Sequence, residues 1–283
     1  MEKFKENFIC DDPANKGEKK LSVDIFRHGK TDYNQKKTTP IEEARDLTPE
    51  AIRQIKASAE QLADMIGQDE EVAIWSSPLG RTLHTAKTVS NVLQARGIKL
   101  RKKGIGAAYG IKVFKELTDI KNFSRELFIP LVEGGEVAYG GQKFFIDKKE
   151  SNPKNLSGTD YYIEEEIKNI PATIKNKWPP EFIKEIEGME NFHKVTKRIM
   201  RPLSRIEKLK DKPYRVIIVT HNAMTNFIGN VYSGGKFLDL DPGKFINLEN
   251  KQGKLIPTKF GDVPITQKEK ELLTEYKDFM EIT

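Results

Sequence analysis

The spacing of apolar and polar positions predicts a strand, a helix and a second strand in the first third of the chain. Residues 21–26 alternate and carry β-branched side chains, as is typical of a strand. Residues 48–50 (Thr-Pro-Glu) combine an N-cap, an early proline and an acid, and apolar residues at helical spacing follow as far as Gly67. Residues 72–75 are wholly apolar, which predicts a strand buried on both faces.

The alternation of strand and helix continues further along the chain. Ser77 and Pro78 predict a second capped helix, which we expect to end at Gly97. Residues 216–219 form the clearest buried strand, and a helix is expected over 223–231. Strands that alternate with helices predict an α/β fold with a largely parallel sheet.

Three other regions complete the expected organisation. Residues 1–20 form a polar leader, and residues 244–256 have the pattern of a β-hairpin. Over residues 117–195 the periodicity degrades, so we expect a cap or lid inserted at the sheet edge. We therefore expect one domain over residues 1–283.

Composition excludes several classes of protein. Hydrophobic residues make up 37% and charged residues 32% of the 283 residues, which allows a sizeable core. The net charge of +6 comes from lysines spread along the chain, which argues against a nucleic-acid-binding face. The single cysteine, Cys10, excludes a disulfide framework. No apolar run approaches the ~20 residues of a membrane span, and the leader lacks a signal-peptide pattern. We expect a cytoplasmic protein without a membrane partner.

Polar residues follow each of the three predicted buried strands. Because the carboxyl ends of parallel strands meet at one edge of a sheet, we expect these residues to converge there. The three groups are Arg27-His28, Ser76-Ser77 with Arg81, and Thr220-His221.

Two arginines beside two histidines suit the chemistry of a phosphate group. Each guanidinium offers a planar fork of donors that stays charged. A neutral imidazole can attack phosphorus and carry the phosphoryl group, while a protonated second imidazole stabilises the charge on the oxygens. The helix that follows His221 points its N-terminal amides toward the same place.

A proton donor for the leaving group completes this chemistry. Glu116 follows a short predicted strand, where partial burial of its carboxyl would suit a general acid. Glu126 and Glu133, in the inserted segment, are alternatives if that segment folds back.

Several separate motifs resemble one family, the histidine phosphatase or phosphoglycerate mutase-like superfamily. The resemblance covers about residues 21–116 and 214–260, and the blocks occur in the family's order. The motifs are Arg27-His28-Gly29-Lys30-Thr31 with Tyr33-Asn34, Leu47-Thr48-Pro49-Glu50-Ala51, Ser76-Ser77-Pro78-Leu79-Gly80-Arg81, Lys115-Glu116-Leu117 and Val219-Thr220-His221.

The resemblance implies a three-layer α/β/α sandwich and a role for each residue. His28 is the expected nucleophile and Glu116 the expected proton donor. Arg27, Arg81 and His221 would form the rest of the phosphate pocket, with a hydrogen bond from Asn34. No metal and no cofactor are implied. The sequence departs from the family at Lys30, usually an acid or amide, and at Asn222, commonly a glycine, whose backbone N–H can still face the phosphate.

The leading hypothesis is a metal-independent phosphatase that hydrolyses a phosphomonoester through a phosphohistidine intermediate. The first alternative is a mutase that moves a phosphoryl group between hydroxyls with the same residues. The second is a module that binds a phosphorylated ligand with weak catalysis. The expected partner is a phosphorylated small molecule or phosphoprotein, recognised through the inserted segment.

Overall fold

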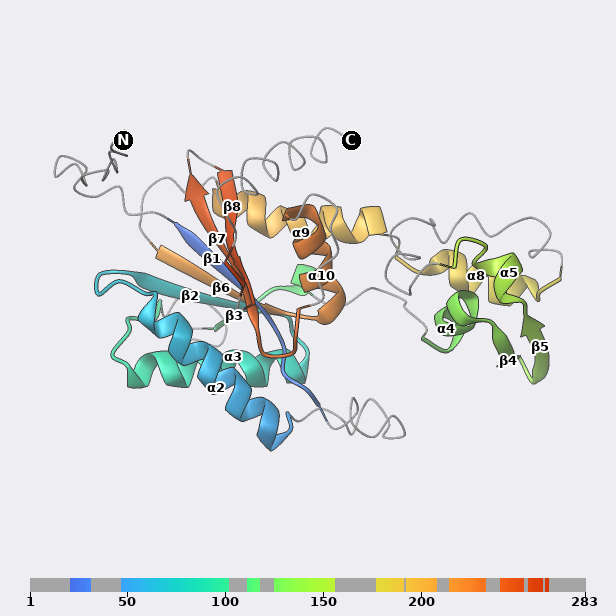
Figure 1. The fold of residues 1–283 in the computed structure, drawn as a ribbon, viewed down its shortest axis with the longest axis horizontal. Helices are drawn as coiled ribbons and strands as arrows, with labels where there is room; N and C mark the ends of the chain where they lie inside the picture. The colour runs from blue at the N-terminus through green and yellow to red at the C-terminus, as the bar shows by residue number, and fades with distance from the viewer. Residues whose placement is uncertain are drawn as a thin grey trace, which may run out of the picture.

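The computed structural model describes residues 21–31, 47–101, 111–117, 125–155, 177–190, 192–207, 214–232, 240–251, 254–261 and 263–264. The leader, Cys10 and Asn34 lie outside this part of the chain. The elements in chain order (Figure 1) are β1 (Ser22–Arg27), α2 (Pro49–Asp64), β2 (Glu71–Ser76), α3 (Gly80–Ala95), β3 (Ile111–Val113), the 3-10 turn η2 (Lys115–Leu117), α4 (Arg125–Glu133), β4 (Gly135–Tyr139), β5 (Gln142–Ile146), α5 (Lys148–Ser151), α8 (Pro180–Gly188), α9 (Phe192–Glu207), β6 (Tyr214–Thr220), α10 (Asn222–Tyr232), β7 (Phe245–Lys251), β8 (Lys254–Phe260) and β9 (Val263–Pro264).

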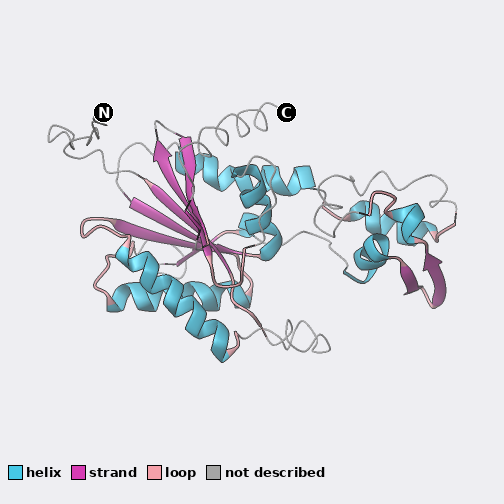
Figure 2. Ribbon diagram, in the orientation of Figure 1, coloured by secondary structure: helices cyan, strands magenta, loops and turns pink. Residues whose placement is uncertain are grey.

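The main sheet has the strand order β3-β2-β6-β1-β7-β8-β9 (Figure 2). β1 and β2 each pair in parallel with β6, and β3 pairs in parallel with β2. β7, β8 and β9 continue the sheet by antiparallel pairing from the other edge of β1. The prediction of an α/β fold with a mostly parallel sheet is therefore confirmed.

Alternate residues of the central strands pack into two separate hydrophobic cores. On β6, Ile217 and Val219 join the cluster that α2 and α3 bury. Val216 and Ile218 point to the other face and join the cluster under α9 and α10. Because side chains of a strand alternate between faces, helices cover both sides of the parallel strands in three layers.

One of the two predicted helix caps forms, and the other is wrong. Thr48 caps α2, where its Oγ1 accepts a hydrogen bond from the backbone N–H of Ala51 at 3.1 Å. Before α3 the capping position is taken by Leu79, which makes no side-chain cap bond. Ser77 lies too early in the chain to cap α3, and its hydroxyl instead meets His221.

The antiparallel hairpin lies where the pattern predicts it, although its strands are longer than expected. Residues 244–256 contain β7 and the first three residues of β8, which continues to Phe260. Pairing of β7 with β1 places this hairpin beside the strand that carries Arg27.

The inserted segment contains regular structure of its own. α4, β4, β5, α5 and α8 gather to one side of the main sheet (Figure 1). Its aromatic side chains form a small core, in which the ring centroid of Phe144 lies 5.0 Å from that of Phe182 and 6.3 Å from that of Trp178. Phe145 points outward and is 72% exposed. The expected boundary at residue 195 falls within the continuous helix α9. That this segment covers the site stays a prediction.

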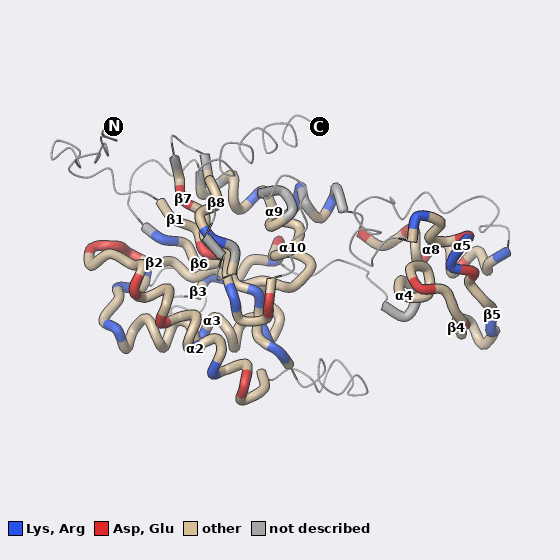
Figure 3. The backbone as a smooth tube through the Cα atoms, in the orientation of Figure 1, with Lys and Arg blue, Asp and Glu red and all other residues tan. Residues whose placement is uncertain are grey.

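Charged residues are interleaved along the tube of the backbone. Figure 3 shows Lys and Arg among Asp and Glu in both the sheet region and the inserted segment. Within the described ranges, no helix is long and apolar enough to cross a membrane.

Candidate functional site

The carboxyl ends of β1, β2 and β6 bring the predicted polar groups to one edge of the sheet. Arg27 pairs in register with Thr220, and Ser76 pairs with Val219. Just after β1, the backbone N–H of His28 donates to the carbonyl of Thr220 at 3.0 Å. Just after β2, the backbone N–H of Ser77 donates to the carbonyl of Val219 at 3.1 Å. His28, Ser77 and His221 therefore start from neighbouring strand ends.

The two histidine rings face each other in the interior. Their centroids are 5.4 Å apart and their planes meet at 66°, and both residues are buried. The Nδ1 atom of His28 lies 2.7 Å from the carbonyl oxygen of Gly29. A carbonyl can only accept, so Nδ1 carries the proton and donates it. The lone pair of His28 is therefore on Nε2.

Gly29 fixes the loop that carries His28 against the helices α2 and α3. A Cβ atom at this position would meet the Cδ1 atom of Ile55 at 2.7 Å, closer than packed atoms can approach. The backbone N–H of Gly29 also donates to Thr85 Oγ1 at 3.3 Å. The glycine is thus required by close packing, and the packing holds the His28 ring in place.

The hydrogen bonds of His221 define its tautomer as well. The Arg81 guanidinium donates to Nδ1 of this ring, with Nε at 3.3 Å and Nη2 at 3.1 Å. Arginine is a donor only, so Nδ1 is the accepting nitrogen and Nε2 carries the proton. Nε2–H then donates to the hydroxyl of Ser77 at 2.8 Å.

Burial and neighbouring cations keep both imidazoles neutral. Burial is the main cause that lowers the pKa of His28 to about 3, with help from Arg81 and Arg27, while the hydrogen bond to Gly29 acts in the other direction. The pKa of His221 is also well below its usual value, because of burial first and then the charges of Arg81, His28 and Arg198. The expectation that the second imidazole is protonated concerns the protein with a phosphate bound, and it stays a prediction.

Arg27 is held from the antiparallel side of the sheet. Its backbone N–H donates to the carbonyl of Lys244 at 3.0 Å, and its carbonyl accepts from Gly243 at 3.1 Å. Its guanidinium donates through Nη1 to the carbonyl of Leu240. The chain just before β7 thus aligns this arginine.

The turn that carries Glu116 is fastened to the same edge of the sheet. The backbone N–H of Phe114 donates to the carbonyl of Ser76 at 2.9 Å. Thr220, directly before His221, donates through its hydroxyl to the carbonyl of Leu117 at 2.8 Å. Glu116 lies between these two anchors and is half-buried.

The remaining predicted residues differ in how far the structure describes them. Asn222 begins α10, and its buried Oδ1 atom has no hydrogen-bond partner among the described residues. Glu133 is exposed at the end of α4, in the inserted segment. The side chain of Glu126 and the whole of Asn34 lie outside the described part. The catalytic roles of all these residues stay predictions.

Two contacts of the site were not expected from the sequence. The pattern around Ser77 predicts a helix cap at the strand end, and does not predict the contact of its hydroxyl with His221. Arg198 on α9 is not among the predicted site residues, although its guanidinium donates to the carbonyl of Glu116. Nothing in the sequence around Arg198 resembles a site motif, so only the three-dimensional arrangement could reveal it.

Comparisons with known proteins identify a similar family and a similar fold. Residues 23–103 match the model of the histidine phosphatase superfamily (branch 1). The chain resembles the solved structure of phosphoglycerate mutase from Bacillus anthracis str. Sterne, with 15% identity, a TM-score of 0.54, and coverage of 91% of this chain and 97% of that one. Bacillus stearothermophilus YhfR is similar in fold, with 16% identity, a TM-score of 0.51, and coverage of 86% and 98%. No curated protein matches the sequence.

Proposed function

We propose that the chain is a member of the histidine phosphatase superfamily, whose model matches residues 23–103, and that it hydrolyses a phosphomonoester through a phosphohistidine intermediate. The expected substrate is a phosphorylated small molecule or a phosphoprotein. The resemblance implies chemistry that needs no metal.

One observation carries the proposal, namely a buried neutral histidine whose lone pair lies on Nε2 beside arginines. A nucleophile must be unprotonated, and the lowered pKa of His28 keeps it so at every physiological pH. The hydrogen bond to Gly29 holds the ring in the tautomer that attack requires. A neutral histidine near two guanidinium groups suits a substrate that brings its own negative charge.

In the first half of the reaction, Nε2 of His28 attacks phosphorus and a P–N bond forms as the ester P–O bond breaks. The leaving oxygen takes a proton from Glu116, which becomes a carboxylate. Arg27 and Arg81 stabilise the charge on the phosphoryl oxygens. A bound dianion also favours the protonated form of His221, which would then donate to the phosphoryl group.

In the second half, the Glu116 carboxylate takes a proton from water and the resulting oxygen attacks phosphorus. The P–N bond breaks, inorganic phosphate leaves, and His28 returns to its neutral form with its lone pair on Nε2. A mutase would differ only here, because a second hydroxyl of the substrate would accept the phosphoryl group in place of water.

A substrate panel combined with trapping of the intermediate tests the proposal. Sugar phosphates, nucleotides, phosphopeptides and 2- and 3-phosphoglycerate are each incubated with the protein, and free phosphate is measured. We expect phosphate release and an acid-labile phosphoryl group on His28 during turnover. Interconversion of the phosphoglycerates without net phosphate release would identify a mutase. Phosphate binding with neither reaction over the whole panel would identify a binding module.

A further inference from the structure

Arg198 joins three segments that are far apart in the sequence. It lies on α9 and is buried, with 8% of its surface exposed. Its Nε and Nη2 atoms donate to the two carboxylate oxygens of Glu190 at 2.8 and 2.6 Å. Its Nη1 atom donates to the backbone carbonyl of Glu116. The bidentate ion pair therefore orients the guanidinium, and its remaining nitrogen, Nη1, binds the turn η2.

This contact is the third anchor on a turn of only three residues, Lys115–Leu117. The other two anchors come from the strand-end residues Ser76 and Thr220, which fix Phe114 just before the turn and Leu117 at its end. The bond from Arg198 acts on Glu116 itself, at its own carbonyl. Because a side chain leaves the backbone at a fixed angle, holding this carbonyl fixes the direction in which the carboxyl starts.

Glu190 gives the contact its connection to the inserted segment. It lies between the end of α8, at Gly188, and the start of α9, at Phe192, where the chain returns from the insertion. The side chains of Glu190 and Arg198 are 11% and 9% exposed, so their ion pair is shielded from water. A shielded bidentate ion pair has one preferred geometry. The position of Glu190 therefore determines the position of the Arg198 guanidinium, which in turn holds η2.

We infer that Arg198 is a positioning residue for the reaction, which aims Glu116 at the leaving group and is itself held by Glu190 at the exit of the inserted segment. This inference rests on the proposed function, in which Glu116 is the general acid. Arg198 hydrogen-bonds a backbone carbonyl and a carboxylate, and its charge also acts on His221. Because Arg198→Lys keeps that charge, the loss in this variant falls on proton donation.

The dependence of the rate on the leaving group distinguishes positioning from mere packing. A nitrophenolate leaves without a proton, whereas the alkoxide of an alkyl phosphate needs one. The test compares kcat/KM of Arg198→Lys for p-nitrophenyl phosphate and for glycerol phosphate. Since general-acid catalysis contributes ~10²–10⁴-fold, we expect a loss of at least about tenfold for the alkyl ester and less than about threefold for the nitrophenyl ester. The loss falls in kcat, with KM unchanged.

Two further variants control for a general loss of stability and for an effect unrelated to the ion pair with Glu190. Glu190→Gln keeps the shape of the partner but weakens its hold on Arg198, and we expect the same selectivity with a smaller amplitude. Arg215→Lys is the matched control, because Arg215 is a buried arginine on β6 that pairs with Asp24, away from His221. It should lower thermal stability and leave the ratio of the two rates unchanged.

Glu116→Gln separates failure of the inference from failure of the proposed function. If Glu116→Gln lowers both rates equally, Glu116 is not the acid and the proposed mechanism fails at that residue, and the inference fails with it. If Glu116→Gln is selective but Arg198→Lys and Glu190→Gln lower both rates equally, the mechanism stands and the inference is overturned. The inference also requires that Arg198→Lys adds no further loss in the Glu116→Gln background.

Discussion

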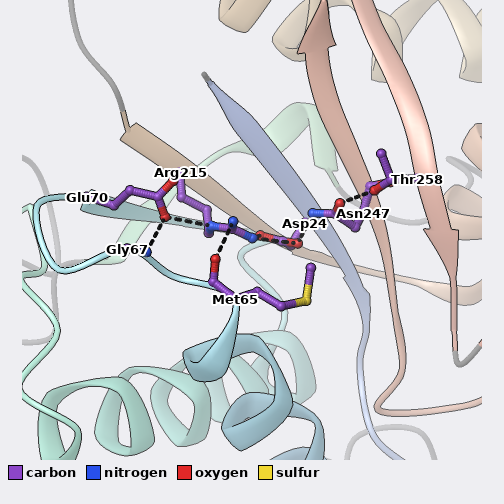
Figure 4. A network of polar contacts seen from close by, with 7 residues as sticks. All are labelled: Asp24, Met65, Gly67, Glu70, Arg215, Asn247 and Thr258. Carbon is purple, nitrogen blue, oxygen red and sulfur yellow. Dashed lines mark hydrogen bonds and ion pairs between the residues drawn. The ribbon is translucent and has the colours of Figure 1, made fainter. Parts of the chain in front are cut away.

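Two buried polar networks lie at opposite ends of the same two strands, and they are built from opposite charge arrangements. At the amino end, β1 contributes Asp24 and β6 contributes Arg215 (Figure 4). At the carboxyl end, β1 leads into His28 and β6 leads into His221.

The amino-end network is held together by ion pairs within the protein. Arg215 donates to Asp24 Oδ2 at 3.1 Å and to Glu70 Oε2 at 3.2 Å, and its Nη2 donates to the carbonyl of Met65 at 3.1 Å. Asn247 donates to the other oxygen of Asp24 at 2.7 Å. Burial raises the pKa of the Asp24 carboxyl, although Arg215 and Asn247 oppose this effect. The buried Asp24 and Arg215 thus have partners within the protein itself.

At the carboxyl end, the charges that act on the two buried imidazoles are positive. Arg81 and Arg27 lower the pKa of His28, and Arg81 and Arg198 lower that of His221. Ion pairs and hydrogen bonds in the first network support the fold, and the positive potential at the two imidazoles of the second supports binding of an anion. The following predictions challenge this contrast, beginning with the largest effect.

His28→Ala should abolish turnover without unfolding the protein. Loss of a covalent nucleophile lowers kcat by at least about 10⁴-fold. Phosphate release is measured beside a thermal melt. His84→Ala, on α3, is the control and should keep its activity. Turnover of His28→Ala at a rate near that of the natural protein would exclude the phosphohistidine route.

Arg215→Met should do the reverse, with a large loss of stability and little change in chemistry. It leaves the buried carboxylate of Asp24 without its cation and removes the partner of the half-buried Glu70, which costs about 3–5 kcal/mol of unfolding free energy. Urea unfolding measures the loss, and kcat is measured at a temperature where the variant is folded. Arg96→Met breaks an exposed ion pair with Glu60 and Asp64 and should scarcely change stability. Equal losses in the two variants would contradict a special role for the buried network.

Acid should destabilise the protein through the carboxyl-end network. The folded-state pKa of His28 is about 3, below its ordinary value of 6.5, so the unfolded chain binds more protons between these pH values. Stability is therefore full above pH 6.5 and is lost as the pH falls toward 3, by about 1.4 kcal/mol at pH 5.5 from this residue alone. The lowered pKa of His221 acts in the same direction.

Urea unfolding at pH 7.5 and pH 5.5 measures this dependence in the natural protein and in His28→Gln. The loss should be smaller in the variant by about that same 1.4 kcal/mol, because one of the two buried imidazoles is gone. An identical loss in both proteins would mean that His28 titrates normally in the folded state.

Ser77→Ala should have the smallest effect. It removes the hydroxyl that accepts a hydrogen bond from Nε2 of His221, while Arg81 still holds Nδ1 of that ring. A hydrogen bond of this kind contributes about 1 kcal/mol, so we expect kcat/KM to fall by roughly fivefold. Ser76→Ala is the neighbouring control, since Ser76 donates only to the Ser77 carbonyl. A similar loss in both serine variants would place the effect in the backbone and not in His221.

The sequence predicts the layout of the sheet and its polar edge because both depend on local patterns. Short apolar runs such as residues 216–219 identify buried strands, and the residue after each strand must lie at its carboxyl end. The N-cap of α2 is likewise encoded within four residues, Thr48 to Ala51. Structural features formed by residues close together in the chain can therefore be predicted from the sequence.

Contacts that join distant segments could not be predicted in this way. Ser77 has the chemistry of a cap, and only the approach of β6 turns its hydroxyl toward His221. Arg198 is separated from Glu116 by 82 positions and sits in a helix whose pattern indicates amphipathic packing alone. The lowered pKa of His221 likewise depends on burial, and this burial results from the packing of segments that are distant in the sequence.

The placement of β1 has a consequence for how the chain is made. This strand is made before both of its neighbours, β6, which begins at Tyr214, and β7, which begins at Phe245. During synthesis, both edges of β1 therefore stay open until some two hundred further residues have been added. Such long-range pairing is slow and exposes the strand to association with other chains. Arg27 and His28 thus reach their positions at the site only after β6 has been made.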